Sequence, residues 1–171
     1  PVTFTGNVTF VDGGAIDKSL ILTGDTALGA ATRTLTVNTG TTVAGKVVDF
    51  QGIISSTGAF GITKAGTGTL KLSGTNTYTG DTTITGGTLA LSGAGSIASS
   101  PLIKINSTTT LDVTGLTAPT FTIGSSQTVG GNGTILATGK TVAATARSRP
   151  ATAPAPSHRM AAPFSLESAA I

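Results

Sequence analysis

Residues 66–93 read G-T-G-T-L-K-L-S-G-T-N-T-Y-T-G-D-T-T-I-T-G-G-T-L-A-L-S-G, and this stretch contains one motif twice. The heptapeptide G-T-L-K-L-S-G of residues 68–74 returns, nineteen residues later, as G-T-L-A-L-S-G at residues 87–93. Alternate side chains of an extended strand point to the same face, so the two leucines within each copy share a face. The flanking glycines allow the chain to bend. A strand and a corner that recur at a fixed period predict one coil of a solenoid.

The composition predicts an all-β chain. Thr is the commonest residue, Gly occupies 24 of 171 positions, and only 10% of the residues are charged. Thr favours pleated strands, and glycine favours the corners between them. The hydrophobic fraction of 38% is enough for a core and argues against disorder. We therefore expect one folded domain over residues 1–144.

Several classes of function are excluded by composition. The chain has no cysteine, so it has no disulfide, thiol nucleophile or thiolate metal site. No apolar run approaches the roughly 20 residues of a membrane-spanning helix. The net charge of +3 comes from scattered residues without a basic face, so we expect no nucleic-acid partner. The chain begins at Pro1 with no visible signal peptide, as expected of a processed or trimmed product.

Less regular copies of the leucine motif recur on both sides of the twin copies. The spacing of their leading apolar residues suggests coils of about 15 to 25 residues, which suits a parallel β-helix. A β-sandwich also has short strands at regular spacing, but it has no reason to repeat its sequence. We predict that the core ladder of inward side chains consists of Leu20, Leu35, Leu70, Leu72, Leu89, Leu91, Leu111 and Ile135.

Corners are predicted where Gly, Asp and Asn cluster. The tetrapeptide T-G-D-T occurs twice, at residues 23–26 and 79–82, so Gly24 with Asp25 and Gly80 with Asp81 are expected at bends. Asn132 lies in G-G-N-G, and Asn tolerates the left-handed backbone that bends require.

The sequence of residues 62–139 resembles the autotransporter-associated β-strand repeat. The resemblance is carried by the twin copies, by G-S-I-A-S-S-P at residues 95–101, by L-D-V-T-G at 111–115 and by residues 128–133. It implies a right-handed β-solenoid that is secreted, extracellular or at the cell surface. Members of this family usually serve adhesion or a structural role.

The character of the chain changes after Ala144. Residues 145–171 are rich in Ala and Pro and lack the strand motif, so they predict an extended tail. Phe164 and Leu166 are apolar anchors in this tail, suited to docking on the same solenoid or on a neighbouring subunit.

Candidate catalytic and binding groups are sparse. Six Asp residues and Glu167 are scattered, mostly beside Gly, which favours turn formation over catalysis. Asp12 and Asp17 flank a Gly-Gly bend and are a weak calcium alternative, because the pattern does not repeat. His158 is the only histidine and has no partner nearby, and Tyr78 belongs to the repeat and is expected to pack. We predict no catalytic site, metal or cofactor.

Three functions remain from the sequence. The first is a non-enzymatic extracellular structural solenoid whose copies stack head to tail into a fibre or layer, with the tail bracing the junction. The second is a passenger-type adhesin fragment that binds a cell or glycan surface. The third is a glycan-cleaving β-helix enzyme, which the missing carboxylate cluster disfavours. The expected partners are therefore copies of the same chain, with cell-surface or matrix glycans as an alternative.

Overall fold

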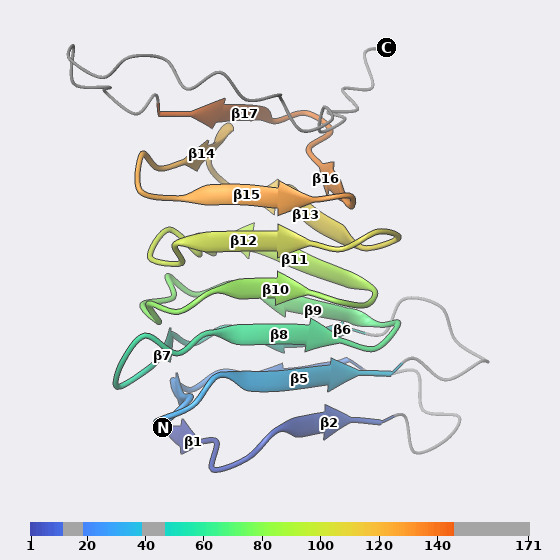
Figure 1. The fold of residues 1–171 in the computed structure, drawn as a ribbon. Helices are drawn as coiled ribbons and strands as arrows, with labels where there is room; N and C mark the ends of the chain where they lie inside the picture. Colours follow the sequence, from blue (N-terminus) through green and yellow to red (C-terminus); the bar gives the residue numbers. More distant parts are fainter. Residues whose placement is uncertain (12–18, 39–46, 146–171) are drawn as a thin grey trace, which may run out of the picture.

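The protein is a parallel β-solenoid of six coils, described by a computed structural model over residues 1–11, 19–38 and 47–145 (Figure 1). Within these residues every strand pair is parallel and no helix forms. The predicted β-helix is confirmed, and the antiparallel pairing of a β-sandwich is excluded. Among the described residues, no helix is long and apolar enough to cross a membrane.

Two six-stranded sheets form the walls of the tube. The front sheet contains β2 (Val8–Phe10), β5 (Arg33–Val37), β8 (Ile62–Ala65), β10 (Thr82–Ile84), β12 (Leu102–Ile105) and β15 (Thr128–Gly131). The rear sheet contains β3 (Leu20–Leu22), β6 (Val47–Phe50), β9 (Thr69–Leu72), β11 (Thr88–Gly93), β13 (Thr110–Leu116) and β16 (Thr134–Leu136). The front strands run left to right in Figure 1 while the chain climbs from its N-terminus, so the coil is right-handed.

A third, less regular side completes each coil. It contains β1 (Val2–Thr3), β4 (Thr26–Ala27) and β7 (Ile54–Ser55) in one sheet, and β14 (Thr120–Ile123) and β17 (Thr141–Ala144) in another. We call these five the side strands. Coil 1 contains β1, β2 and β3, and coil 6 contains β14, β15 and β16.

The core consists of side chains stacked in register from coil to coil. In the rear sheet one column runs Leu20, Val48, Leu70, Leu89, Leu111 and Ile135. Leu72 pairs with Leu91 in the neighbouring column. All of these residues except Leu20 are buried, and the core is continuous from Phe4 to Ile135.

Two of the predicted core residues need correction. Leu35 is buried, but it lies in the front sheet, in register with Val8 and Lys64, so it does not stack on Leu20. Val48 occupies the position between Leu20 and Leu70. Leu20 points to the same face as Val48, yet it is 49% exposed because its column ends in coil 1 and no described coil covers it.

Close contact between coils explains why glycines occupy the corners. A Cβ atom on Gly61 would lie 1.9 Å from the carbonyl oxygen of Asp81, and one on Gly74 would lie 2.3 Å from that of Gly52. Both contacts are with backbone atoms, which cannot move without disturbing the coil spacing. Any larger residue would therefore force adjacent coils apart at these corners.

The stacked leucines are expected to carry much of the stability. Leu89→Ala should lower the free energy of unfolding by about 3 kcal/mol, because Leu89 is fully buried between two coils and its loss leaves a cavity. Leu136→Ala, at a position that is 40% exposed, is the matched control and should cost less than about 1 kcal/mol. Urea denaturation followed by circular dichroism measures both. Equal losses would contradict this stacking.

Candidate functional site

The carboxylates of the described residues do not converge. Asp25 and Asp81 lie at bends, as predicted for turn-forming residues, whereas Asp49 and Asp112 lie within strands β6 and β13. The expectation that these last two form turns is therefore wrong. Asp112 binds the backbone N–H and the hydroxyl of Thr114, both through Oδ1. Among the described residues no group of three or more His, Cys, Asp or Glu is placed to hold a metal ion.

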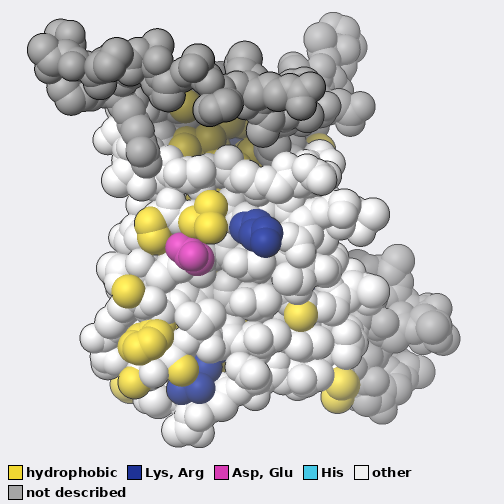
Figure 2. All heavy atoms as spheres, viewed as in Figure 1, with side chains coloured by type: hydrophobic (Ala, Val, Ile, Leu, Met, Phe, Trp, Pro, Cys, Tyr) yellow, Lys and Arg dark blue, Asp and Glu magenta, His cyan; other side chains and the backbone are white. Residues whose placement is uncertain are grey.

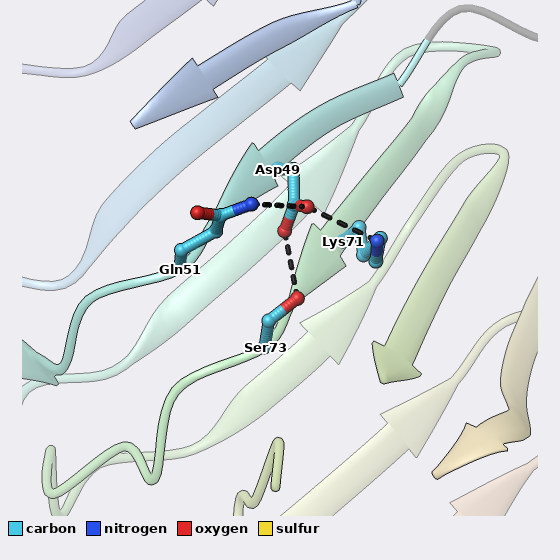
Figure 3. Close-up of polar contacts among 4 residues, drawn as sticks. All are labelled: Asp49, Gln51, Lys71 and Ser73. Atoms are coloured by element: carbon cyan, nitrogen blue, oxygen red, sulfur yellow. Dashed lines mark hydrogen bonds and ion pairs between the residues drawn. The ribbon is translucent and has the colours of Figure 1, made fainter. Parts of the chain in front are cut away.

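Asp49 is the buried carboxylate among them and the centre of a polar cluster (Figure 3). Its Oδ2 lies 3.0 Å from the Lys71 ammonium and accepts a longer bond, 3.4 Å, from the amide of Gln51. Its Oδ1 accepts a hydrogen bond of 2.8 Å from the Ser73 hydroxyl. Lys71 and Ser73 belong to the next coil along the axis. The carboxylate therefore ties two coils together, and both of its oxygens are engaged.

Lys64 is a buried cation that the sequence did not reveal. It lies in β8 on the inward face of the front sheet, in register with Leu35 and Ile84, and has no exposed surface. Its ammonium donates to the carbonyl oxygens of Ala65 and Gly66 in its own coil and of Gly86 in the next, at 2.8 to 3.0 Å. Burial lowers the pKa of Lys64 to about 8. These three hydrogen bonds hold the chain together at the corner between the front and rear sheets in two successive coils.

Tyr78 packs inside the tube, as predicted. Its hydroxyl lies 2.7 Å from that of Thr82, which donates to the Ser100 hydroxyl, which in turn donates to the carbonyl oxygen of Leu102. Burial raises the pKa of Tyr78, so its hydroxyl stays protonated. This chain of buried hydrogen bonds joins coil 4 to coil 5 and presents no group to a ligand.

The predicted corner residues all lie between strands, but the two T-G-D-T segments occupy different corners. Gly24 and Asp25 connect the rear sheet to the side strands, and Asp25 accepts a hydrogen bond of 2.9 Å from the Ile53 N–H of the next coil. Gly80 and Asp81 lead into β10 of the front sheet, where the Asp81 carbonyl accepts from Ile62 N–H. Asn132 lies in the bend between β15 and β16.

The outer face of the front sheet is largely uncharged. Figure 2 shows this face with few cationic or acidic side chains. Thr34, Thr63 and Thr83 stand in register on three successive coils, followed by Lys104. This column therefore aligns three hydroxyl groups and one ammonium on successive coils.

The first coil exposes apolar side chains at its open end. We call its strands β1, β2 and β3, together with these side chains, the apolar rung. Each of β1, β2 and β3 has a strand partner on one side only among the described residues. Val2, Leu20 and Ile21 are large hydrophobic side chains exposed at this end. Phe10 is half-buried and packs edge-on against Phe50, with ring centroids 6.1 Å apart. Residues 1–11 and 19–24 contain no charged side chain. Of the features found on this chain, this end is the strongest candidate for an interaction site.

The last coil differs from the first. In the described residues β15 and β16 also have one strand partner each, yet Ile135 of β16 is only 1% exposed. The two ends therefore differ in their rear-sheet column: among the described residues Ile135 is buried at the last coil, whereas its counterpart Leu20 is 49% exposed at the first.

Some predicted residues lie outside the described ranges. These are Asp12, Asp17, His158, Phe164, Leu166 and Glu167, together with residues 146–171 of the predicted tail.

Residues 62–91 match the family model for the Passenger-associated-transport-repeat. The predicted resemblance is confirmed for this segment, which is shorter than the predicted span of 62–139. It contains Lys64, Tyr78, the first of the twin copies and residues 87–91 of the second. No curated protein and no solved structure shows significant similarity to the chain. Because the repeat occurs in autotransporter passengers, the solenoid is consistent with a passenger-type protein that is secreted or lies at the outer surface.

The buried ammonium of Lys64 predicts a specific dependence of stability on pH. Its pKa is about 8 in the folded chain and 10.5 when exposed, so the unfolded chain binds more protons between these values. The free energy of unfolding should therefore rise between pH 8 and pH 10.5, by up to about 3 kcal/mol, and this contribution should be flat below pH 8. Urea denaturation across this pH range measures it.

Lys64→Met and Lys71→Met separate this effect from the general titration of the chain. Lys64→Met should remove the rise, whereas Lys71→Met, at a partly exposed lysine, should keep it. A rise that persists in Lys64→Met would assign it to another group.

Proposed function

We propose that the protein is a non-enzymatic structural solenoid of the cell surface whose copies stack head to tail into a fibre or layer. The observation that carries the proposal is the exposed apolar rung of coil 1, with its three unpaired strand edges. Edge strands are normally protected by charge, by bulges or by a covering segment. The described residues of this rung have no charged side chain, so its edges suit the addition of another coil.

The parallel direction of all strands supports a head-to-tail contact between copies, which can repeat from copy to copy without forming a closed ring. Moving a copy along the axis brings β2 beside β15 and β3 beside β16 with the same strand direction, as in every internal pair. Leu20 of the second copy would then continue the column that ends at Ile135. Two different surfaces meet in this arrangement, so it extends indefinitely as a filament.

The side strands limit how the junction forms. Strand β17 lies beyond β14 and occupies the place that β1 of an added copy would take. The two long sheets therefore make the junction in our proposal, and β1 or β17 is displaced. Residues 146–171 begin at this end of the tube, where a packed tail would brace the contact.

The proposed absence of catalysis is supported by the use of the carboxylates. Asp49 and Asp112 are bound by neighbouring side chains, and Asp25 accepts a backbone N–H from the next coil. A glycan-cleaving site needs two carboxyl groups that face one substrate. The contacts of Asp49 and Asp25 hold successive coils together, and those of Asp112 fix the local conformation of β13.

Leu20→Lys tests the stacking. The substitution places a charge at the proposed junction, where stacking would bury it without a partner, and it should abolish filaments. Ile53→Lys is the matched control, because Ile53 is an exposed apolar residue in the middle of the tube and its charge stays in water. Negative-stain microscopy and sedimentation velocity measure assembly, and circular dichroism checks that both variants keep the fold.

Fibres of constant width from the unmodified chain and from Ile53→Lys, but not from Leu20→Lys, would support the proposal. A closed dimer would contradict head-to-tail stacking. Isolated short rods at high concentration would also contradict it and would favour an adhesin.

A further inference from the structure

The column of side strands is interrupted between coil 5 and coil 6. The sheet β1-β4-β7 ends in coil 3, and one isolated bridge, Thr75 with Ser96, continues it from coil 4 to coil 5. Strand β14 of coil 6 pairs with β17 on one edge and, among the described residues, has no strand partner on the other. A cavity of about 290 Å³ lies at this break, between residues 93–98 and residues 116–122.

A change of register accompanies the break. Ala90 of β11 pairs with Asp112, whereas Ser92 pairs with Gly115, so β13 contains one extra residue at this point. An extra residue of this kind bends the strand that holds it. The bend directly precedes the segment that leads into β14, which accounts for the loss of pairing there.

The lining of the cavity is largely apolar and includes hydroxyl groups. Apolar lining residues include Leu116, Phe121 and Ile97 with the small residues Gly93 and Ala98, and the hydroxyls belong to Ser96, Thr117, Thr120 and Thr122. No charged side chain of the described residues lines it. An engineered apolar cavity of about 150 Å³ holds benzene, so this one has room for a phenyl ring.

Gln127 is the buried polar side chain in the lining, and its amide is fully engaged. It donates to the carbonyl oxygens of Ile97 and Ser100 at 2.9 and 2.8 Å and accepts from Gly124 N–H at 3.0 Å. Further polar groups beside the cavity are the hydroxyls of Thr120 and Thr122 and the backbone of the unpaired edge of β14. An apolar side chain carried on an extended backbone matches both features, as in strand addition to a sheet edge.

The chain itself supplies such a segment. Residues 163–166 read P-F-S-L, so Phe164 and Leu166 fall on one face of an extended strand. Thr145, the last described residue, donates its N–H to the carbonyl oxygen of Ile123 at the end of β14. The nineteen residues from Thr145 to Phe164 can span roughly 60 Å, whereas a strand added to the opposite edge of β14 lies two strand spacings, about 10 Å, from β17.

We propose that the segment of residues 163–166 adds to the unpaired edge of β14 and places the ring of Phe164 in this cavity of its own chain. The short tether makes the effective concentration of the segment high, on the order of millimolar. The cavity of a copy stacked beyond coil 6 is farther away, because coils 1 to 4 of that copy intervene. Docking of this kind anchors the tail beside the proposed junction, but it does not require stacking.

Tryptophan fluorescence tests the docking, because the full chain contains no Trp. Phe164→Trp should give an emission maximum shifted to the blue of Ala153→Trp, which places the same reporter elsewhere in the tail. Adding Ala118→Phe, which fills the cavity from an exposed position of its lining, should return the Phe164→Trp emission to that of Ala153→Trp. Circular dichroism confirms that Ala118→Phe keeps the solenoid, and Ala98→Phe provides a second blocking variant.

Dilution and Leu20→Lys separate this proposal from stacking. The blue shift should survive a roughly hundredfold dilution and should persist in Leu20→Lys, because the docking is within one chain. A shift that disappears on dilution would assign the tail to a neighbouring copy and overturn the proposal. Emission like that of Ala153→Trp, or a shift unaffected by both Ala118→Phe and Ala98→Phe, would also overturn it.

Discussion

The stability of the structure depends on each coil burying the inward apolar side chains of the next coil. Short parallel strands place a side chain directly above its counterpart, and the column from Val48 to Leu111 is buried because every member lies between two neighbours. The contact is local along the axis, so the stability of an interior coil depends on the coils on either side. Leu20 occupies the same inward position in the first coil, and its side chain is half exposed because it has a neighbouring coil on one side only.

The corners impose a second requirement, because the chain must turn without leaving buried backbone groups unpaired. Glycine allows close approach between coils at positions such as Gly61, and its backbone carbonyls then need partners. Lys64 supplies three donors to the carbonyls of one corner, and the chain from Tyr78 to Ser100 satisfies polar groups at another. These buried polar contacts hold the coils at a fixed register, whereas the apolar columns alone tolerate sliding.

The sequence was sufficient for the class of fold and for the most regular coils. The twin motifs stack as predicted because their strand and corner positions are identical, so Leu70 pairs with Leu89. The prediction failed for Leu35 because the front and rear sheets need the same alternation of apolar residues, and one sequence cannot show to which wall a strand belongs. Val48 was missed since it breaks the leucine motif. Lys64 was missed because a lysine in an alternating strand suggests the solvent face, and only the corner geometry explains why it points inward.

In a solenoid whose coils are equivalent, a distinct binding site arises only where the repeating pattern of the coils is interrupted. Any interior coil of this tube looks to a ligand much like its neighbours, since equivalent positions recur at every rung of the two long sheets. The repeat is interrupted in two places: at the first coil, where the rear column ends at the half-exposed Leu20, and at the extra residue of β13, where the side strands separate around a cavity. Both interruptions expose unpaired strand edges beside apolar side chains, a combination that favours extended polypeptide over small ligands. This combination is the reason that both of our proposals place extended polypeptide at these edges, from a second copy at the ends and from the tail at the cavity.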